Sequence, residues 1–411
     1  MADRKNPLTI LAVAPLPFYQ NGVKTFHFGG SIFYAELLPG LARQGHTVRV
    51  IAETPATNAG ETRTGLDWTI PQLEVEWSAL EYRSGSTPPP ATYYEAARKQ
   101  MAAVFTRFVK QQRPDIVIIG RETVANPVLS LCKEYRLPAL LIAHGSPTWS
   151  LLHGAYPEAP KQQLIDAFRQ VDGIVAIAQH LVDILQKLGV TRVDLIPNIA
   201  DPIRFHPEPK DHRLLQELII APEQIVVGYF STLKPRKRPL DLIVAAEKAL
   251  KTQPRIVYVI GGVGSCREEM LELGRRLGIA DRFRYVGEID YQRMPQYLNL
   301  ADIVVLPSER EGAPLVYRET QACGRVLLAS DIPAAREAIV DGETGLLFRL
   351  GDTEDLAAKI VALAENRELR QMIGQKARAA TAQQTLDRWI EAYEEVSRRV
   401  VLHTTPVERK T

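Results

Sequence analysis

At 411 residues the chain is too long for one ordinary domain, and its length predicts two domains of roughly 200 residues each. Its 45% hydrophobic and 24% charged residues are typical of a soluble globular protein with two full cores. Fifty Lys and Arg residues against 48 Asp and Glu residues give a formal charge of +2, which argues against a nucleic-acid-binding protein but leaves room for a local basic patch.

The chain begins with a short apolar run that ends at a proline, LTILAVAP (8–15). We interpret this run as a first strand rather than a signal peptide, because it is broken and no small-residue cleavage site follows it. No apolar stretch approaches the ~20 residues that a membrane-spanning helix needs. Cys132, Cys266 and Cys323 lack CxxC spacing, which indicates a reducing compartment and offers no metal cage. We therefore expect a cytoplasmic protein, and leave open a peripheral contact with the inner face of a membrane.

Short apolar runs alternate with longer amphipathic segments along the whole chain. In the first half these runs are LTILAVAP (8–15), TVRVIAE (47–53), DIVIIG (115–120), LPALLIAH (137–144), GIVAIAQ (173–179) and VDLIPN (193–198). In the second half they are IVVGYFS (225–231), RIVYVIGG (255–262), FRYVGEI (283–289), DIVVLPS (302–308), RVLLASD (325–331) and GLLF (345–348). Unbroken apolar strands with helices between them are typical of parallel sheets covered on both faces. The sequence therefore predicts an α/β fold with two doubly wound, Rossmann-like domains and a ligand cleft at the carboxyl ends of both sheets.

A polar stretch that contains prolines separates the two halves, NIADPIRFHPEPKDH (198–212), and we interpret it as a domain linker. The predicted parts are an N-terminal domain at 1–200, a C-terminal domain at 201–382, a final helix at 383–402 and a disordered tail at 403–411. The final helix carries an apolar stripe that we expect to pack back onto the first domain, formed by Leu386, Trp389, Ile390, Tyr393 and Val396.

One region interrupts the alternation of strands and helices. Residues 54–93 are rich in Thr, Gly, Ser and Pro, with a short strand pair suggested around LDWTIPQLEVEWSAL. A loop of this length is either functional or mobile, and the sequence does not decide between the two.

Several familiar motifs are absent or incomplete. The glycine turn GGVGSC (261–266) is too short for the GxGxxG dinucleotide fingerprint, which is a weak signal on its own. No Asp-x-Asp motif occurs, which argues against a transferase that holds a divalent ion on a diphosphate. No Ser-His-Asp arrangement with a nucleophile elbow is recognisable. We therefore expect neither a metal nor a cofactor.

The segment EGAPLVYRETQACG (311–324) follows a strand and turns into a short helix, with Glu311 before the helix and Glu319 inside it. Pro314 can occupy the first helical turn, whose free N–H groups and dipole suit a pyrophosphate. Carboxylates bind vicinal hydroxyls through charge-assisted hydrogen bonds, and a helical path between the two glutamates would rise ~12 Å. This pattern suggests a nucleotide sugar. On spacing alone, the alternative is a solvated helix residue and an ordinary loop charge.

This segment, with ADIVVLPS before it and GRVLLASDIPAAREAIVDGETGLLF after it, resembles the signature of the retaining glycosyltransferases of family 4. The resemblance extends to GGSIFYAELLPGLARQGHTVRV (29–50), to the DGIVAIAQ and LIPNIAD region and to the final helix, so it covers nearly the whole chain. It implies the two-domain GT-B fold, with an acceptor side in the first domain and a nucleotide-sugar donor side in the second.

The resemblance also implies roles for residues of the second domain. Glu311 would face the donor sugar, and Glu319 would bind the ribose hydroxyls. Leu315 and Val316 would offer backbone N–H groups to the pyrophosphate, with Gly312 in the same donor-binding segment.

In the first domain, Gly29 and Gly30 match the family's glycine loop, where a missing Cβ lets the backbone approach a phosphate, and Ser31 would then start a helix. A plain tight turn is the alternative. His144 matches a histidine that contacts the donor sugar, and its neutral imidazole can bind a sugar hydroxyl. A lone histidine is more often structural, as we expect for His46. We assign no role to the histidines at 27 and 153.

The loop in GYFSTLKPRKRPLDLIVAA (228–246) departs from the family pattern, which has Gly-Arg, four residues and then a Lys that neutralises the leaving diphosphate. Counting back from the next helix places that Lys at Lys237 and the missing Arg at Thr232, whereas counting forward gives Lys234. We favour Lys237, with Arg236 or Lys234 in place of the absent Arg. A solvated basic loop is the alternative.

We therefore predict a metal-independent retaining hexosyltransferase that uses a UDP- or GDP-linked sugar and a hydroxyl acceptor, which could be a small molecule, a lipid-linked molecule or a glycan. The alternatives are a phosphorylase or epimerase of the same fold, a nucleotide-dependent oxidoreductase and a catalytically silent sugar-binding protein. The sequence does not indicate the base, sugar, acceptor, linkage or oligomeric state.

Overall fold

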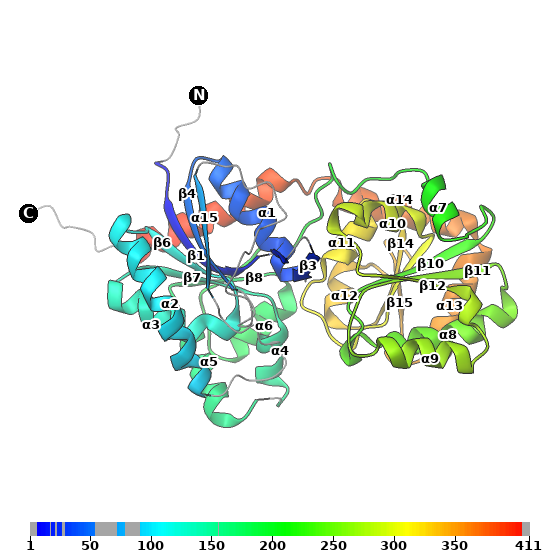
Figure 1. Ribbon diagram of the computed structural model, residues 1–411, viewed down its shortest axis with the longest axis horizontal. Helices are drawn as coiled ribbons and strands as arrows, with labels where there is room; N and C mark the ends of the chain where they lie inside the picture. Colours follow the sequence, from blue (N-terminus) through cyan, green and yellow to red (C-terminus); the bar gives the residue numbers. More distant parts are fainter. Residues whose placement is uncertain are drawn as a thin grey trace, which may run out of the picture. The chain divides into compact units, whose positions relative to one another are not determined.

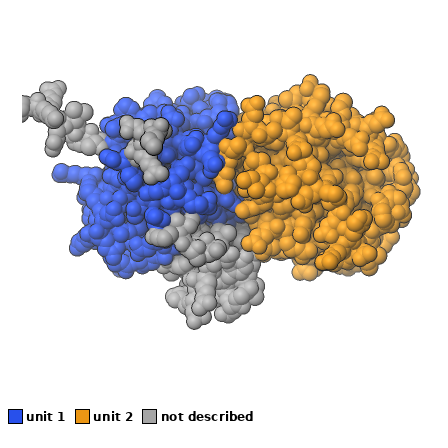
Figure 2. Space-filling model, turned by 90° about the horizontal axis from the view of Figure 1, so that it is seen from above, with its two compact units in different colours: residues 1–197, 387–411 blue, residues 198–386 orange. Residues whose placement is uncertain are grey.

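The computed structural model describes residues 6–16, 18–20, 23–26, 29–53, 72–78, 91–154 and 156–404. The chain divides into unit 1, residues 1–197 with 387–411, and unit 2, residues 198–386 (Figure 2). The first division therefore falls after residue 197 rather than at the predicted 200. Apart from 72–78 and 91–93, the loop predicted at 54–93 lies outside the described residues, as does most of the predicted tail.

Unit 1 is built on a parallel sheet with strand order β5-β4-β1-β6-β7-β8-β9 (Figure 1). Its strands are β1 (Thr9–Pro15), β4 (Thr47–Glu53), β5 (Leu73–Ser78), β6 (Ile116–Ile119), β7 (Ala139–Ala143), β8 (Gly173–Ala176) and β9 (Val193–Leu195), with a separate antiparallel pair, β2 (Phe18–Gln20) and β3 (Val23–Phe26). Its helices are α1 (Gly29–Arg43), α2 (Ala91–Gln111), η1 (Glu122–Val124), α3 (Ala125–Tyr135), α4 (Ser146–Leu152), α5 (Glu158–Gln170), α6 (Gln179–Lys187) and α15 (Leu386–Thr404).

Unit 2 repeats the same design with strand order β12-β11-β10-β13-β14-β15, again parallel throughout. Its strands are β10 (Ile225–Phe230), β11 (Ile256–Gly261), β12 (Phe283–Gly287), β13 (Ile303–Leu306), β14 (Val326–Ser330) and β15 (Leu346–Phe348). Its helices are α7 (His212–Glu217), η2 (Pro235–Lys237), α8 (Pro239–Thr252), α9 (Arg267–Arg276), η3 (Ala280–Arg282), η4 (Tyr291–Arg293), α10 (Met294–Leu300), α11 (Leu315–Ala322), α12 (Pro333–Ala338), α13 (Thr353–Glu365) and α14 (Arg367–Thr381).

The apolar strands of unit 2 supply two cores, one on each face of the sheet. Val226 of β10 and Val304 of β13 pack in one core, whereas Val227 and Val305 pack in the other. Successive side chains of a strand point to opposite faces, so a strand covered on both sides must be apolar at every position. Helices α10 and α11 lie over one face, and α8 and α9 lie over the other (Figure 1). The unbroken apolar runs therefore predicted a sheet covered by helices on both faces, because each such position has to be buried.

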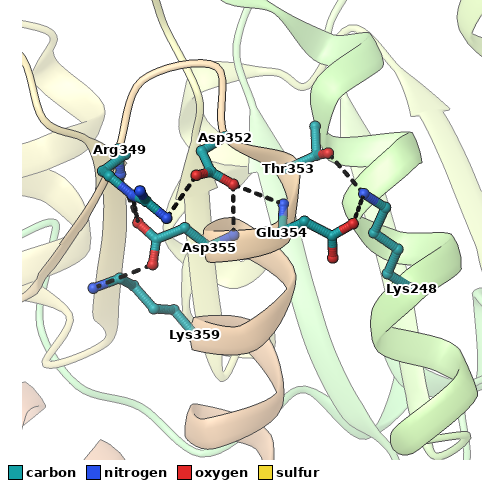
Figure 3. Close-up of polar contacts among 7 residues, drawn as sticks. All are labelled: Lys248, Arg349, Asp352, Thr353, Glu354, Asp355 and Lys359. Atoms are coloured by element: carbon teal, nitrogen blue, oxygen red, sulfur yellow. Dashed lines mark hydrogen bonds and ion pairs between the residues drawn. The ribbon is translucent and has the colours of Figure 1, made fainter.

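Helix α13 shows how local polar contacts fix a helix of unit 2 in place (Figure 3). The Asp352 side chain caps the helix by accepting hydrogen bonds from the backbone N–H groups of Glu354 and Asp355, at 3.0 and 2.9 Å. Lys248 of α8 then pairs with Glu354, and Arg349 pairs with Asp352. These contacts stabilise the α8–α13 layer and are structural.

The final helix, α15, returns to unit 1. Trp389 and Tyr393 are buried against Phe33 of α1, with ring centroids 4.9 and 5.7 Å apart. Ile390 lies so close to α1 that a Cβ at Gly40 would be 2.2 Å from its Cδ1 atom. The helix runs from 386 to 404 rather than over the predicted 383–402, and its apolar stripe continues past Val396 to the buried Val400.

Within the described part of the chain, no helix is both long enough and apolar enough to cross a membrane.

Candidate functional site

The candidate site of unit 2 lies at the carboxyl ends of β10 and β13. These strands are neighbours at the place where the strand order reverses, since β10 leads outward to β11 and β13 leads outward to β14. Ligands of doubly wound sheets bind at such a reversal. The loop after β10 carries η2, and the loop after β13 carries Glu311. Topology therefore brings together two segments that lie 74 residues apart in the sequence.

Glu311 forms a buried ion pair with Lys237. The Lys237 ammonium donates to Glu311 Oε1, and only 8% and 5% of the two side chains are exposed. Arg236 Nη1 lies 3.4 Å from Glu311 Oε2 and also donates to the Arg310 carbonyl at 3.3 Å. Burial lowers the pKa of Lys237. Burial alone would raise the pKa of Glu311, but the two adjacent cations hold that pKa below its ordinary value.

The same contacts test the prediction for the cationic loop after β10, which carries Lys234, Arg236 and Lys237. Lys237 is buried and Arg236 half-buried, whereas Lys234 is exposed. A solvated basic loop is therefore wrong for Lys237, because a buried ammonium needs a partner or a ligand. The structure brings together Lys237, Arg236 and Glu311, but their roles toward a donor stay predictions.

The glycine turn after β11 supports the cationic loop. A Cβ at Gly262 would lie 1.8 Å from the Ser231 carbonyl oxygen, and one at Gly264 would lie 2.2 Å from the Leu233 oxygen. Both glycines have positive φ, at +137° and +156°. Leu233 N–H also donates to the Val263 carbonyl at 2.9 Å. These glycines allow close backbone packing between the turn after β11 and the loop after β10.

The segment 311–324, which contains Glu311 and Glu319, forms a loop followed by helix α11, which has eight residues. Pro314 is the N-cap with extended backbone, so the prediction that it lies within the first turn is wrong. The helix starts at Leu315, and within the described chain no side chain caps its first turn. The backbone N–H groups of Leu315 and Val316 therefore lie at the positive end of the helix dipole, and no side chain of a described residue accepts a hydrogen bond from them. Gly312 lies three residues before the helix.

Glu319 is buried on this helix, with only 3% of its surface exposed. Its Oε1 atom has no hydrogen-bond partner among the described residues. Burial raises the pKa of Glu319 to about 7, although a Tyr291 hydrogen bond and the charge of Arg204 act in the opposite direction. The alternative of a solvated helix residue is therefore wrong. A buried carboxyl oxygen without a partner is a costly feature, and a ligand hydroxyl would satisfy it.

Unit 1 places a second group of polar residues at the carboxyl ends of β6 and β7. His144 follows β7, as the sequence predicted. Gly29 and Gly30 are the first residues of α1, so the prediction that Ser31 starts the helix is wrong. The pair β2–β3 also separates these glycines from β1, so they do not directly follow the first strand.

His144 is partly exposed, and Tyr34 Oη lies 2.9 Å from its Nε2 atom. Burial, followed by the charge of Arg121, lowers the pKa of His144 to about 3, so the imidazole is neutral. The Phe33 ring contacts it edge-on, with centroids 4.8 Å apart.

Arg121 and Glu122 belong to this group, and the sequence analysis missed them. Glu122 Oε1 accepts hydrogen bonds from the backbone N–H of Gly145 at 2.9 Å and from the Thr148 hydroxyl at 3.2 Å. Burial raises the pKa of Glu122 and lowers the pKa of Arg121 to about 9. The available signal was two charged residues directly after the apolar run at 115–120.

Two other described histidines, His46 and His153, have different partners. His46 is buried and accepts a hydrogen bond from the backbone N–H of Leu8 at 2.9 Å, with Glu394 of α15 beside its other nitrogen. Its role is therefore structural. His153 stacks on Trp149, and the histidine at 27 lies outside the described residues.

Comparison with known proteins follows the same division. A family model described as Glycosyltransferase Family 4 matches residues 29–204, and one described as Glycosyl transferases group 1 matches residues 212–380. A D-inositol 3-phosphate glycosyltransferase of Nocardia farcinica is 31% identical over 61% of this chain and 58% of its own length. The chain thus spans a little more than half of that relative.

Two solved structures share the fold. A sucrose-phosphate synthase from Thermosynechococcus elongatus has a TM-score of 0.81 at 17% identity, over 96% of this chain and 100% of its own. The Anabaena protein HepE, crystallised with UDP and glucose, has a TM-score of 0.76 at 19% identity, over 95% of this chain and 100% of its own.

The two doubly wound parallel units have the architecture of the GT-B fold, as the sequence predicted. More narrowly, the chain belongs to glycosyltransferase family 4.

Proposed function

We propose that the protein is a retaining glycosyltransferase that moves a hexose-type sugar from a UDP- or GDP-linked donor to a hydroxyl acceptor without a metal ion. The carrying observation is the buried Lys237–Glu311 pair, which lies where β10 and β13 end. A buried ammonium held in this way is a preorganised site for the negative charge that develops on a departing diphosphate.

Unit 2 can bind each part of such a donor. The uncapped N-terminus of α11 offers the backbone N–H groups of Leu315 and Val316 to the diphosphate. Lys237 and Arg236 carry positive charge for the same group. Glu319 offers a carboxyl oxygen without a described partner to vicinal ribose hydroxyls. Glu311, already fixed by two cations, would bind the sugar hydroxyls near the anomeric carbon.

In unit 1, His144 would accept a hydrogen bond from a sugar hydroxyl, because its imidazole is neutral. Gly29 and Gly30 would let the backbone approach the ligand.

The chemistry then needs no protein nucleophile. The bond between the anomeric carbon and the diphosphate oxygen breaks, and its electron pair leaves with the diphosphate. The acceptor hydroxyl attacks the anomeric carbon from the same face, and its proton passes to a β-phosphate oxygen. Rate enhancement comes from charge stabilisation and positioning of the two reactants. Retention of the anomeric configuration follows from attack on the face that the leaving group vacates.

The comparisons support a nucleotide-sugar donor without defining it. HepE was crystallised with UDP and with UDP-glucose, and the Nocardia relative is named as a glycosyltransferase. The three cysteines are free and buried, in keeping with the cytoplasmic location that forms part of the proposal.

A thermal-shift screen against UDP- and GDP-linked sugars tests donor binding, because a ligand that binds only the folded protein raises the melting temperature. A Glu319→Gln variant should respond less than the unsubstituted protein to the same donor. NMR of the product formed with the stabilising donor then gives its anomeric configuration, and an inverted product would refute retention. Turnover with inorganic phosphate in place of the acceptor would identify a phosphorylase, and conversion of the donor sugar alone would identify an epimerase.

A further inference from the structure

Tyr34 lies in the segment 29–50 and was assigned no role from the sequence, yet its hydroxyl contacts the polar group of unit 1. Its side chain is fully buried in α1, with 0% of its surface exposed. Its Oη atom lies 2.9 Å from the Gly120 carbonyl oxygen and 2.9 Å from His144 Nε2. The three residues come from α1, from the end of β6 and from the end of β7.

The directions of these two hydrogen bonds follow from counting protons. A phenol carries one hydrogen, and a carbonyl oxygen can only accept. The Tyr34 hydrogen is therefore committed to Gly120, and Tyr34 can only accept from His144. Burial raises the pKa of Tyr34 well above its ordinary value, so the phenol keeps its hydrogen.

The same count fixes the proton of His144. Nε2 must carry the hydrogen that it donates to Tyr34, and a neutral imidazole has only one such hydrogen. Nδ1 is then a bare acceptor. Among the described residues, the structure gives Nδ1 no hydrogen-bond partner.

Two further contacts hold the ring and its backbone. Phe33 packs edge-on against the imidazole, with an interplanar angle of 90°. Glu122 accepts from the N–H of Gly145, the residue after His144, whose φ of +106° requires a glycine. The ring therefore keeps one orientation as well as one tautomer.

We propose that Tyr34 is a positioning residue that holds His144 in the Nε2–H tautomer and so makes Nδ1 an obligate hydrogen-bond acceptor. The chemical consequence is specificity for a group that donates, such as a sugar hydroxyl, and against an anionic oxygen such as that of a phosphate. The sugar part of this inference rests on the proposed function. The tautomer part does not.

The direct test uses the free protein, labelled with nitrogen-15 in histidine, with His144→Gln to assign the resonances. Two-bond proton–nitrogen correlations distinguish the two neutral tautomers. The unsubstituted protein should show the Nε2–H form, and Tyr34→Phe should populate the Nδ1–H form. An Nδ1–H form in the unsubstituted protein, or an unchanged spectrum in Tyr34→Phe, would overturn the proposal.

Tyr393→Phe is the matched control. Tyr393 is equally buried and packs on the same Phe33 ring, but its hydroxyl has no hydrogen-bond partner among the described residues. This variant should leave the His144 tautomer unchanged. If this variant changed the His144 tautomer as much as Tyr34→Phe does, the loss of any buried hydroxyl near Phe33 would suffice to change it. That result would refute a specific role for Tyr34.

Binding measurements then examine recognition. Tyr34→Phe should lower the affinity for the nucleotide sugar about tenfold, which is the equivalent of one hydrogen bond, and leave the affinity for the free nucleoside diphosphate unchanged. Equal weakening of both ligands would indicate general damage and refute selective recognition. A protein that binds no nucleotide sugar, yet shows the Tyr34-dependent tautomer, would refute the proposed function and support the role of Tyr34.

Discussion

Removal of either partner of the Lys237–Glu311 pair should destabilise unit 2, and the two losses should be unequal. Breaking a buried ion pair typically costs about 3–5 kcal/mol, because an uncompensated charge remains. Lys237→Met leaves Glu311 with Arg236, whose Nη1 is 3.4 Å away, so we expect a loss of about 3 kcal/mol. Glu311→Gln leaves Lys237 and Arg236 without their shared carboxylate, so we expect a loss of about 5 kcal/mol.

The double variant separates pairing from packing. With both charges replaced by neutral groups of similar size, no uncompensated charge of the pair remains, and the loss should be well below the sum of the single losses. Lys248→Met is the control, because its partner Glu354 is 76% exposed, and such pairs contribute at most about 1 kcal/mol.

The assay must report on unit 2 alone. All four tryptophans lie outside residues 198–386, so tryptophan fluorescence reports on unit 1. Hydrogen exchange of the β10 and β13 amides gives the opening free energy of unit 2 directly. Additive losses in the double variant, or a larger loss for Lys237→Met than for Glu311→Gln, would refute the reasoning.

Three further predictions concern Glu319, the glycine turn and metal dependence. Because burial raises the pKa of Glu319 from 4.5 to about 7, the folded protein binds the extra proton, and stability should fall as pH rises from about 4.5 through 7. In urea titrations, Glu319→Gln should remove this fall in the free energy of unfolding with pH. In calorimetry, the donor affinity of the unsubstituted protein should rise over the same pH range, whereas that of Glu319→Gln should not. Gly262→Ala should cost at least about 3 kcal/mol, because its Cβ would lie 1.8 Å from the Ser231 oxygen, whereas Gly278→Ala meets no atom within 4 Å and should cost about 1–2 kcal/mol. Comparable hydrogen-exchange losses for the two glycine variants would contradict this reading. EDTA should leave transferase activity unchanged, and loss of activity that Mg²⁺ restores would contradict a metal-independent reaction.

The sequence predicted the sheets well because their signal is local. Each apolar run became a strand, and the runs that form β6, β7 and β13 are apolar throughout their buried positions because both faces of those strands are covered. The edge strand β5 was only suggested, and the β2–β3 pair was missed. In LEVEWS, apolar residues alternate with two glutamates, so this run lacks the unbroken apolar character that made most other strands recognisable. Helix ends also shifted by a few residues, as for Gly29 and Leu386, since caps and packing decide the terminal turn.

The residues of the candidate site could be named from the sequence, but their contacts could not. Glu311 and Lys237 were recognisable from their motifs, yet nothing local indicates that they pair or that both are buried. Glu122 and Tyr34 escaped notice for the same reason. Their partners lie 23 and 110 residues away in sequence, and only the parallel order of β1, β6 and β7 brings those segments to one edge of the sheet.

The return of α15 to unit 1 also sets an order of events on the ribosome. Unit 2 is continuous in sequence, so it can fold as soon as residue 386 has emerged. Unit 1 must wait for Trp389 and Tyr393, the last large side chains to cover Phe33 and thus the ring that steadies His144. A nascent or proteolysed chain that ends before this helix would keep unit 2 intact but would lack the side chains that support Phe33 and, through it, His144.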